Sequence, residues 1–442
     1  MRANSTTEYI KAKESFYSLP VWKFSFLDRS CLSMIIRGIW IFDSQLDIEN
    51  MKEGLKELLG YYPHLSGRIK DGIGVYLTNQ GIPFTVVNEP GISLHSLQKS
   101  KDSDLIKHFS TPLATSRIKR GIDPLLTVKV ARLRDASVLG VQCAHACMDG
   151  RSFYTMMENW GKICRKEDFE KPLLDQSLFP GPTVLSKEEI KQLAVSSGWK
   201  SISTFSFITR VLPKFVLGTV NKRSRPFYFS KKALAEIKNR IAQKMGHQVS
   251  TNVALSALLS KMCMKLYGYS HTTECVQLTV VDCRCRLASL PANFVGNASV
   301  VVPTPSFPGD ASIEEIALVI RNTLKPILQN PSRELERFLE LTLNVFSHRL
   351  PLFPFDVTAM YSKKPTVFHI NNFSRFPVYR IDFGSGKPKV VIPSDLANPI
   401  FIWNAPPQKD GVEVYFSGTL ACTIARLKES DPWMKEMQQY SL

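Results

Sequence analysis

His145 and Asp149 have the spacing in this sequence that most directly suggests chemistry. They belong to the segment His145-Ala-Cys-Met-Asp-Gly150, in which an aspartate and a glycine follow the histidine. An imidazole titrates near neutral pH, so a well-placed histidine can take a proton from a hydroxyl or amino group. An aspartate followed by glycine suits a tight turn. The segment predicts a general base beside a turn, and a core histidine beside a turn aspartate is the alternative.

Two strands and a helix are expected to position His145. Residues 128–141 alternate between apolar and polar side chains and then become continuously apolar, which predicts strand, loop and strand. Beyond Gly150, apolar residues recur at helical spacing (Phe153, Met156, Met157 and Trp160). His145 is therefore expected between the end of a buried strand and the start of an amphipathic helix.

The rest of the chain mixes strands and helices around a weakly patterned middle. Between residues 165 and 220 the periodicity fades, and prolines and glycines interrupt it, which indicates a crossover between two halves. After it, Ser230 and Ser250 are good helix N-caps. Strands are expected near residues 225–229, 277–281 and 299–302.

Length and composition indicate a globular protein of two domains. The chain has 442 residues, of which 44% are hydrophobic and 21% charged, and this argues against disordered and coiled-coil classes. It contains no run of apolar residues long enough to span a membrane. Residues 1–8 lack the apolar core of a secretory signal, so a cytoplasmic protein is expected.

The nine cysteines predict neither a disulfide framework nor a metal site. Their number is odd, no CxxC pair occurs, and no histidine cluster completes a zinc site. Reduced cysteines in a cytosolic protein and no bound metal are the expectation. Cys147, two residues after His145, is interpreted as a packing residue and not as a nucleophile.

Basic residues are concentrated in one stretch of a chain whose formal net charge is +17. Residues 214–244 contain nine lysines and arginines and a single acidic residue, Glu236. Nucleic acid, an anionic membrane surface and a phosphorylated cofactor would each account for this excess. A solvated helix face is the structural alternative.

Further segments, read in order around His145, resemble the BAHD acyltransferases, a plant-type family that transfers acyl groups from coenzyme A thioesters to alcohols or amines. The resemblance covers roughly residues 20–427. The segments are Leu58–Ile69, Asp123–Leu126, Leu139–Gly150, Val281–Arg286, Asn293–Asn297 and Tyr379–Pro388, the last of which contains the motif Asp382-Phe-Gly-Ser-Gly386.

The resemblance implies an α/β fold of two domains similar to chloramphenicol acetyltransferase, each a mixed sheet with flanking helices, with a solvent channel between them. The divisions expected are an N-terminal domain over 1–170, a crossover linker over 171–220 and a C-terminal domain with the DFGSG motif over 221–442. A peptide-synthetase condensation domain shares this fold, but Ala144 replaces the first histidine of its motif.

The resemblance also assigns roles to residues. His145 would be the general base, reached by the donor from one side and the acceptor from the other. Asp149 and Gly150 would be structural, with Arg284 or Arg286 as the ion-pair partner of Asp149. The DFGSG residues Asp382, Gly384 and Gly386 would also be structural, with Asp382 in an ion pair away from the chemistry.

Three positions depart from the family pattern. Ser385 replaces the usual tryptophan of DFGWG, and Asn371 and Phe373 stand where a threonine and a tryptophan often line the acceptor or oxyanion pocket. Residues 355–359 lack the arginine that holds the acceptor carboxylate in the hydroxycinnamoyl-shikimate subgroup. Shikimate and quinate are therefore disfavoured as acceptors.

The sequence thus predicts a monomeric acyl-CoA-dependent O- or N-acyltransferase with a small-molecule acceptor and no tightly bound cofactor. No G-x-S-x-G elbow occurs, so no serine acyl-enzyme is expected. The start of the helix after Ser250, including Thr251, offers free N–H groups for coenzyme A phosphates. A catalytically weakened relative with a binding or regulatory role is the alternative. A nucleic-acid binder is a third possibility, supported by charge alone.

Overall fold

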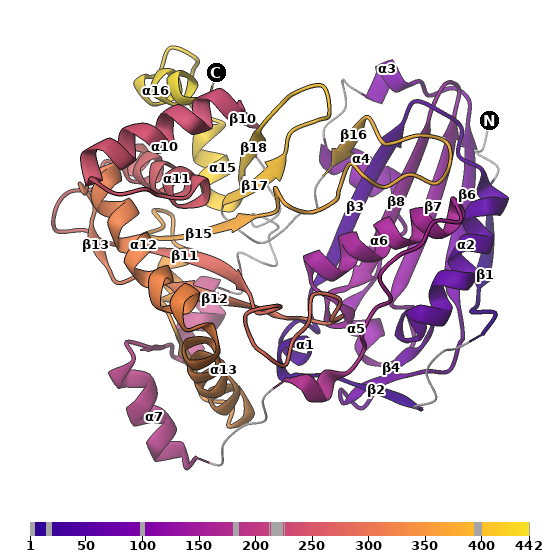
Figure 1. Ribbon diagram of the computed structural model, residues 1–442, viewed down its shortest axis with the longest axis horizontal. Coiled ribbons are helices and arrows are strands. Elements are labelled where there is room, and N and C mark those ends of the chain that lie inside the picture. The colour runs from indigo at the N-terminus through magenta and orange to yellow at the C-terminus, as the bar shows by residue number, and fades with distance from the viewer. Residues whose placement is uncertain are drawn as a thin grey trace. The chain divides into compact units, whose positions relative to one another are not determined.

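The computed structural model describes residues 5–14, 20–97, 102–179, 185–211, 213, 224, 226–392 and 400–441. Within this part the chain forms two compact units. The first comprises residues 1–179, 289–298 and 376–394, and the second comprises the remaining segments. Both contain a mixed sheet with flanking helices, so the predicted fold class is confirmed (Figure 1).

The first unit is built on a six-stranded sheet of order β1-β6-β7-β8-β3-β16. Only β6 and β7 are parallel; the other neighbours are antiparallel. Its strands and helices are β1 (Ser5–Ile10), β2 (Val21–Lys23), α1 (Phe26–Ser30), β3 (Ile35–Phe42), α2 (Ile48–Tyr61), β4 (Arg68–Lys70), β5 (Gly74–Tyr76), β6 (Ile82–Glu89), α3 (Leu94–Leu97), α4 (Asp102–Phe109), α5 (Thr115–Lys119), β7 (Leu126–Leu133), β8 (Ser137–Ala144), α6 (Gly150–Cys164) and β16 (Val390–Ile392). Short 3₁₀ helices cover Pro63–Ser66, His145–Cys147 and Gln176–Leu178.

The strand-loop-strand and helix predicted around His145 are confirmed as β7, β8 and α6. Every residue of β8 is buried, which is why its sequence is continuously apolar. The four apolar residues at helical spacing after Gly150 are all buried in α6.

The second unit is built on β10-β18-β17-β15-β11-β12, with β13 added beside β11. Here β15 lies parallel to both β11 and β17. Its elements are α7 (Lys187–Ser196), β9 (Lys200–Ser201), α8 (Thr204–Ser206), a π-helix (Phe207–Val211), β10 (Phe227–Phe229), α10 (Lys231–Met245), α11 (Thr251–Tyr267), β11 (Glu274–Asp282), β12 (Ser299–Pro303), β13 (Phe307–Pro308), α12 (Ile313–Gln329), α13 (Pro331–Ser347), β14 (Leu352–Phe353), α14 (Val357–Met360), β15 (Val367–Asn372), β17 (Ile400–Asn404), β18 (Val412–Phe416), α15 (Gly418–Ile424) and α16 (Pro432–Tyr440).

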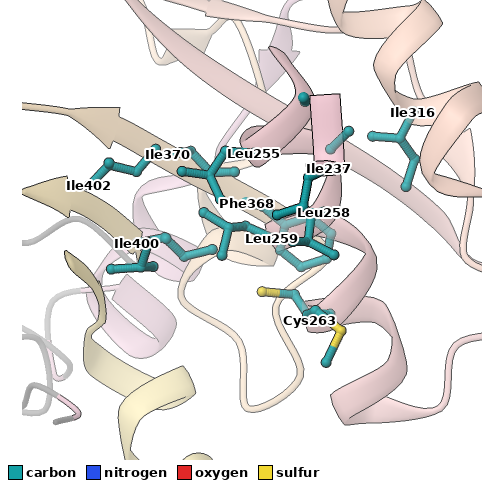
Figure 2. Close-up of a cluster of buried hydrophobic side chains, with 14 of the residues drawn as sticks. Ile237, Leu255, Leu258, Leu259, Cys263, Ile316, Phe368, Ile370, Ile400 and Ile402 are labelled. Carbon is teal, nitrogen blue, oxygen red and sulfur yellow. The ribbon is translucent and has the colours of Figure 1, made fainter. Parts of the chain in front are cut away.

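The core of this unit lies between the sheet and the helices α10, α11 and α12. Figure 2 shows Phe368 and Ile370 of β15 beside leucines of α11, among them Leu258. Strand side chains alternate between faces, so His369, Asn371 and Phe373 follow the opposite face of β15 from this core. Ser230 and Ser250 cap α10 and α11, as the sequence predicts.

Three parts of the predicted division differ from the units. Residues 289–298, expected in the C-terminal domain, belong to the first unit. Residues 376–394, with the DFGSG motif, also belong to it because β16 pairs antiparallel with β3. The stretch expected as a linker contains α7, whose Ile190 and Ala194 pack with Leu341 of α13. The second unit therefore includes part of the predicted crossover.

Candidate active site

The main chain of His145 is fixed on both sides within the first unit. Its N–H donates to the carbonyl oxygen of Met34 at 2.9 Å, and its own carbonyl oxygen accepts from the Asn297 side-chain amide at 2.8 Å. These two main-chain hydrogen bonds therefore fix the position of His145 at the end of β8, and neither of them involves the imidazole.

Asn297 is in turn held by a buried carboxylate, Asp28. The Asn297 main-chain N–H and side-chain amide each donate to Asp28 Oδ1 at 2.8 Å. The other Asp28 oxygen accepts from the N–H and hydroxyl of Ser25, which forms a capping box at the start of α1. Burial raises the pKa of Asp28 to about 6, although the hydrogen bonds from Asn297 and Ser25 lower it.

The aspartate of the HxxxDG segment organises the beginning of α6. Asp149 Oδ1 accepts from the N–H of Ser152 at 2.9 Å, and Oδ2 accepts from the N–H of Ala298 at 3.1 Å. It is thus the N-cap residue of the helix that starts at Gly150. These contacts agree with a structural role for Asp149. The predicted ion pair with Arg284 or Arg286 stays a prediction.

The pKa of the His145 imidazole is shifted by burial and by neighbouring groups, among them Cys31, the C-cap residue of α1. Burial lowers the pKa of His145, whereas the Cys31 sulfur, the carbonyl of its own residue and the charge of Asp149 raise it, to about 9 overall. The charged form of the ring is therefore favoured by Cys31 and Asp149 against the effect of burial.

Asp382 organises its own glycine loop. Its Oδ1 accepts from the N–H groups of Gly384 at 2.8 Å and Gly386 at 3.1 Å. Both glycines have φ near +98°, which side-chain-bearing residues rarely adopt (+97° and +98°). The ion pair expected for this carboxylate stays a prediction; the hydrogen bonds described here are to main-chain N–H groups.

The DFGSG loop packs against the C-terminal end of α6. A Cβ on Gly161 would lie 2.4 Å from the carbonyl oxygen of Asp382, so only glycine allows this approach. The Phe383 ring lies 4.8 Å from that of Trp160. At about 1.5 Å per residue, the twelve residues from Asp149 to Gly161 span roughly 18 Å. The loop therefore supports the far end of the helix that Asp149 begins.

We expect Asp382→Ala to lower the free energy of unfolding by about 2 kcal/mol, because two loop N–H groups lose their acceptor. Asp382→Asn keeps an oxygen at that position and should cost markedly less. Urea unfolding of both variants measures this difference. A low catalytic rate in Asp382→Ala with unchanged stability would contradict the structural role.

Arg284 and Arg286 both bond to Asp282 in their own segment of the second unit. The Arg284 guanidinium is buried and pairs with Asp282 Oδ1 at 3.1 Å, and Arg286 donates to the Asp282 carbonyl at 2.7 Å. Cys285 between them has a φ of +59°. The two arginines therefore fix the turn after β11.

The end of β15 and the start of α11 are joined in the second unit. Asn372 donates to the side-chain oxygen of Asn252 at 2.7 Å. Ser250 Oγ accepts from the N–H of Val253, so this hydroxyl serves as the helix cap, and Thr251 is exposed beside it. The structure thus joins the end of the predicted acceptor strand to the start of the predicted coenzyme A helix through Asn372, whereas Asn371 lies on the opposite face of the strand.

Phe373 is buried in an aromatic cluster. Its ring centroid lies 5.7 Å from that of Trp403 and 6.5 Å from that of Phe401. Upstream on the same strand face, burial lowers the pKa of His369 to about 4. This histidine stays neutral at pH 7, and the sequence analysis did not single it out.

The basic stretch is only partly described: Lys214, Lys222, Arg223 and Arg225 lie outside the described residues. On α10, Lys232 lies 4.0 Å from Glu236 and Lys244 lies 3.2 Å from Glu314. Because these side chains are largely exposed and have acidic partners, they fit the solvated-face interpretation.

None of the described helices has the length and apolar character needed to cross a membrane. The described residues also contain no group of three or more His, Cys, Asp or Glu side chains that could hold a metal ion.

Comparisons with known proteins agree on one family. The model of the Transferase family matches residues 4–420. BAHD acyltransferase BIA1 of Arabidopsis thaliana is 25% identical over 380 residues, which cover 82% of this chain and 80% of the relative. Among solved structures, vinorine synthase aligns with a TM-score of 0.71 at 19% identity, covering 97% of both chains. F. sporotrichioides TRI101, complexed with coenzyme A and T-2, aligns with a TM-score of 0.67 at 16% identity, covering 93% of this chain and 98% of that one.

Proposed function

The chain belongs to the Transferase family of BAHD acyltransferases, and on that premise we propose that it transfers an acyl group from a coenzyme A thioester to a hydroxyl or amino group of a small acceptor. The observation that carries the proposal is the fixed position of His145 between Met34 and Asn297 at the start of the HxxxDG turn.

In the proposed reaction His145 acts as general base. The imidazole takes the proton from the acceptor O–H or N–H while the acceptor atom bonds to the thioester carbonyl carbon. When the C–S bond breaks, the same proton passes to the coenzyme A sulfur, so the ring returns to its starting form. The thioester is already activated, and no covalent acyl-enzyme is needed.

The proposed donor contacts lie at the start of α11. The free N–H groups after Ser250 and the hydroxyl of exposed Thr251 can receive a phosphate, and the 17 residues of this helix give its N-terminus a favourable dipole. TRI101 was solved with coenzyme A bound, which supports a coenzyme A donor here. Asn371, on the strand joined to α11, is the proposed hydrogen-bond donor to the acceptor or oxyanion.

A catalytically weakened relative is less well supported. Ser385 and Asn371 are the departures that favour this alternative. The loop of Ser385 contacts the end of α6 opposite to Asp149, and Asn371 keeps a side-chain amide that can donate a hydrogen bond. We retain from the sequence the proposals of a cytoplasmic monomer without a tightly bound cofactor or nucleic-acid partner.

Release of free thiol from a panel of acyl-CoA donors, with alcohols and amines as acceptors, tests the proposal. We expect thiol release that depends on both substrates and gives the acylated acceptor in equal amount. Binding of donor without turnover across the panel would favour the weakened relative. Oligonucleotide binding that falls steeply with salt, with no thiol release, would favour the nucleic-acid reading.

A further inference from the structure

Exposed apolar side chains gather on one turn of the second unit. The described residues include eleven large hydrophobic side chains that are exposed, and three of them, Phe205, Phe207 and Ile208, lie within four consecutive positions. Their exposed fractions are 77%, 38% and 52%. Single exposed apolar residues are normal on a protein surface, whereas a cluster with two aromatic rings marks a site of interaction.

The turn that carries them, formed by α8 and the π-helix, is anchored at both ends. Ile202 before it and Val211 at its end are buried and pack with Val357 of α14. The N–H of Ile202 also donates to the carbonyl oxygen of Pro351 at 3.0 Å, next to the pairing of β9 with β14. The second unit therefore holds the ends of the turn in its own packing, while the apolar residues between them stay at the surface.

Polar groups of this turn form hydrogen bonds within it. Ser203 Oγ accepts from the N–H of Ser206 at 3.1 Å, and the Ser203 carbonyl oxygen accepts from the N–H of Phe207 at 2.9 Å. The Thr209 hydroxyl donates to the carbonyl oxygen of Phe205 at 2.7 Å. Because these groups are already paired, moving the turn from water into apolar surroundings costs less free energy.

The charged residues around the turn are all basic. From residue 190 to residue 235 the sequence contains nine lysines and arginines and no aspartate or glutamate. Two of the nine, Lys200 and Arg210, lie on either side of the apolar cluster along the chain, and both are exposed. An anionic surface is therefore attracted to this stretch without repulsion from a carboxylate within it.

A bilayer with anionic headgroups matches both properties of the turn. Its interface accepts aromatic and aliphatic side chains, and its headgroups attract lysine and arginine. Nucleic acid would also attract the basic residues, and its bases could stack on the phenylalanine rings, but it offers no comparable environment for the aliphatic Ile208.

From this placement we propose that the turn of residues 204–211 docks on an anionic lipid surface. Phe205, Phe207 and Ile208 enter the interface, and Lys200 and Arg210 contact the headgroups. The docking holds the protein at the membrane surface and does not depend on the acyl transfer proposed above.

The test measures binding of the folded full chain to sedimenting vesicles of phosphatidylcholine alone or of phosphatidylcholine mixed with phosphatidylserine. We expect wild type to bind the mixed vesicles at least tenfold more tightly than the neutral ones. The double variant Phe205→Ser, Ile208→Ser should weaken this binding at least tenfold, because two apolar side chains no longer enter the interface. Both positions are exposed, so the variant should fold, and a thermal melt verifies it.

The matched control is the double variant Leu328→Ser, Phe346→Ser. It removes one aliphatic and one aromatic side chain, 65% and 43% exposed, from α12 and α13, and it should bind the mixed vesicles as wild type does. Arg210→Gln should weaken this binding about fivefold. Lys435→Gln, at an exposed position of α16, should leave it unchanged.

Failure of wild type to sediment with either kind of vesicle would overturn the inference, and so would wild-type affinity in Phe205→Ser, Ile208→Ser. Two other occupants of the turn would give different results, and each would also contradict the proposal. A second copy of the chain would give self-association in sedimentation velocity that this variant loses, without vesicle binding. Nucleic acid would give salt-dependent oligonucleotide binding, again without vesicle binding.

Discussion

His145→Ala is expected to lower the turnover number by about 10²–10⁴-fold at saturating acyl-CoA, the usual contribution of a general base. The main chain at this position is held by Met34 and Asn297 and not by the imidazole, so the variant should fold. Affinity for acyl-CoA should change little, because the ring acts on the acceptor proton.

A matched control is His108→Ala. The His108 ring pairs with Glu89 at 2.7 Å on the surface, so its removal should leave turnover within about twofold of wild type. Thermal melts of both variants verify folding. Wild-type turnover in folded His145→Ala would show that another group takes the proton.

The second expected result is that kcat/KM increases as the pH is raised from neutral towards 9. A base works in its neutral form, so activity is present above the pKa of His145 and is lost as pH falls through it. Burial lowers that pKa, but Cys31 and Asp149 raise it to about 9. We therefore expect kcat/KM to increase about tenfold per pH unit below an inflection near 9.

Cys31→Ala separates the contributions to this inflection. Without the sulfur, burial still lowers the pKa of the ring, so the inflection should move well below 9 and the profile at pH 7–9 should flatten. Rates must be corrected for spontaneous thioester hydrolysis at each pH. An unchanged profile in Cys31→Ala would contradict the coupling of these side chains.

Local patterns were enough to predict the elements that carry His145. The alternating and then apolar run gives β7 and β8, and helical spacing gives α6. Ser250 was recognisable as a helix cap because its hydroxyl serves the next turn. In each case the sequence pattern lies within a single helix or strand, and it reflects the burial or the capping of that element alone.

The placement of the DFGSG segment was not predictable in this way. Residues 376–394 join the first unit through the pairing of β16 with β3, which are separated by more than 340 residues. Local sequence patterns carry no information about a pairing between strands so far apart in the chain. The short length of β16, three residues, also leaves little pattern to read.

The side chains that hold the main chain of His145 could not be predicted, for a similar reason. Asp28 and Asn297 lie 269 positions apart, and no motif in the sequence connects them. One signal was available: Ser25 and Asp28 have the spacing of a capping box, which marks α1. It gave no indication that the same carboxylate binds a distant amide.

The late arrival of β16 affects how the protein is made. During synthesis the first 179 residues leave the ribosome with the outer edge of β3 unpaired and with Asp28 lacking Asn297. An open strand edge invites pairing with other chains, and nascent domains are prone to such errors. The edge of β3 therefore stays open to such pairing until residue 392 has emerged and β16 covers it.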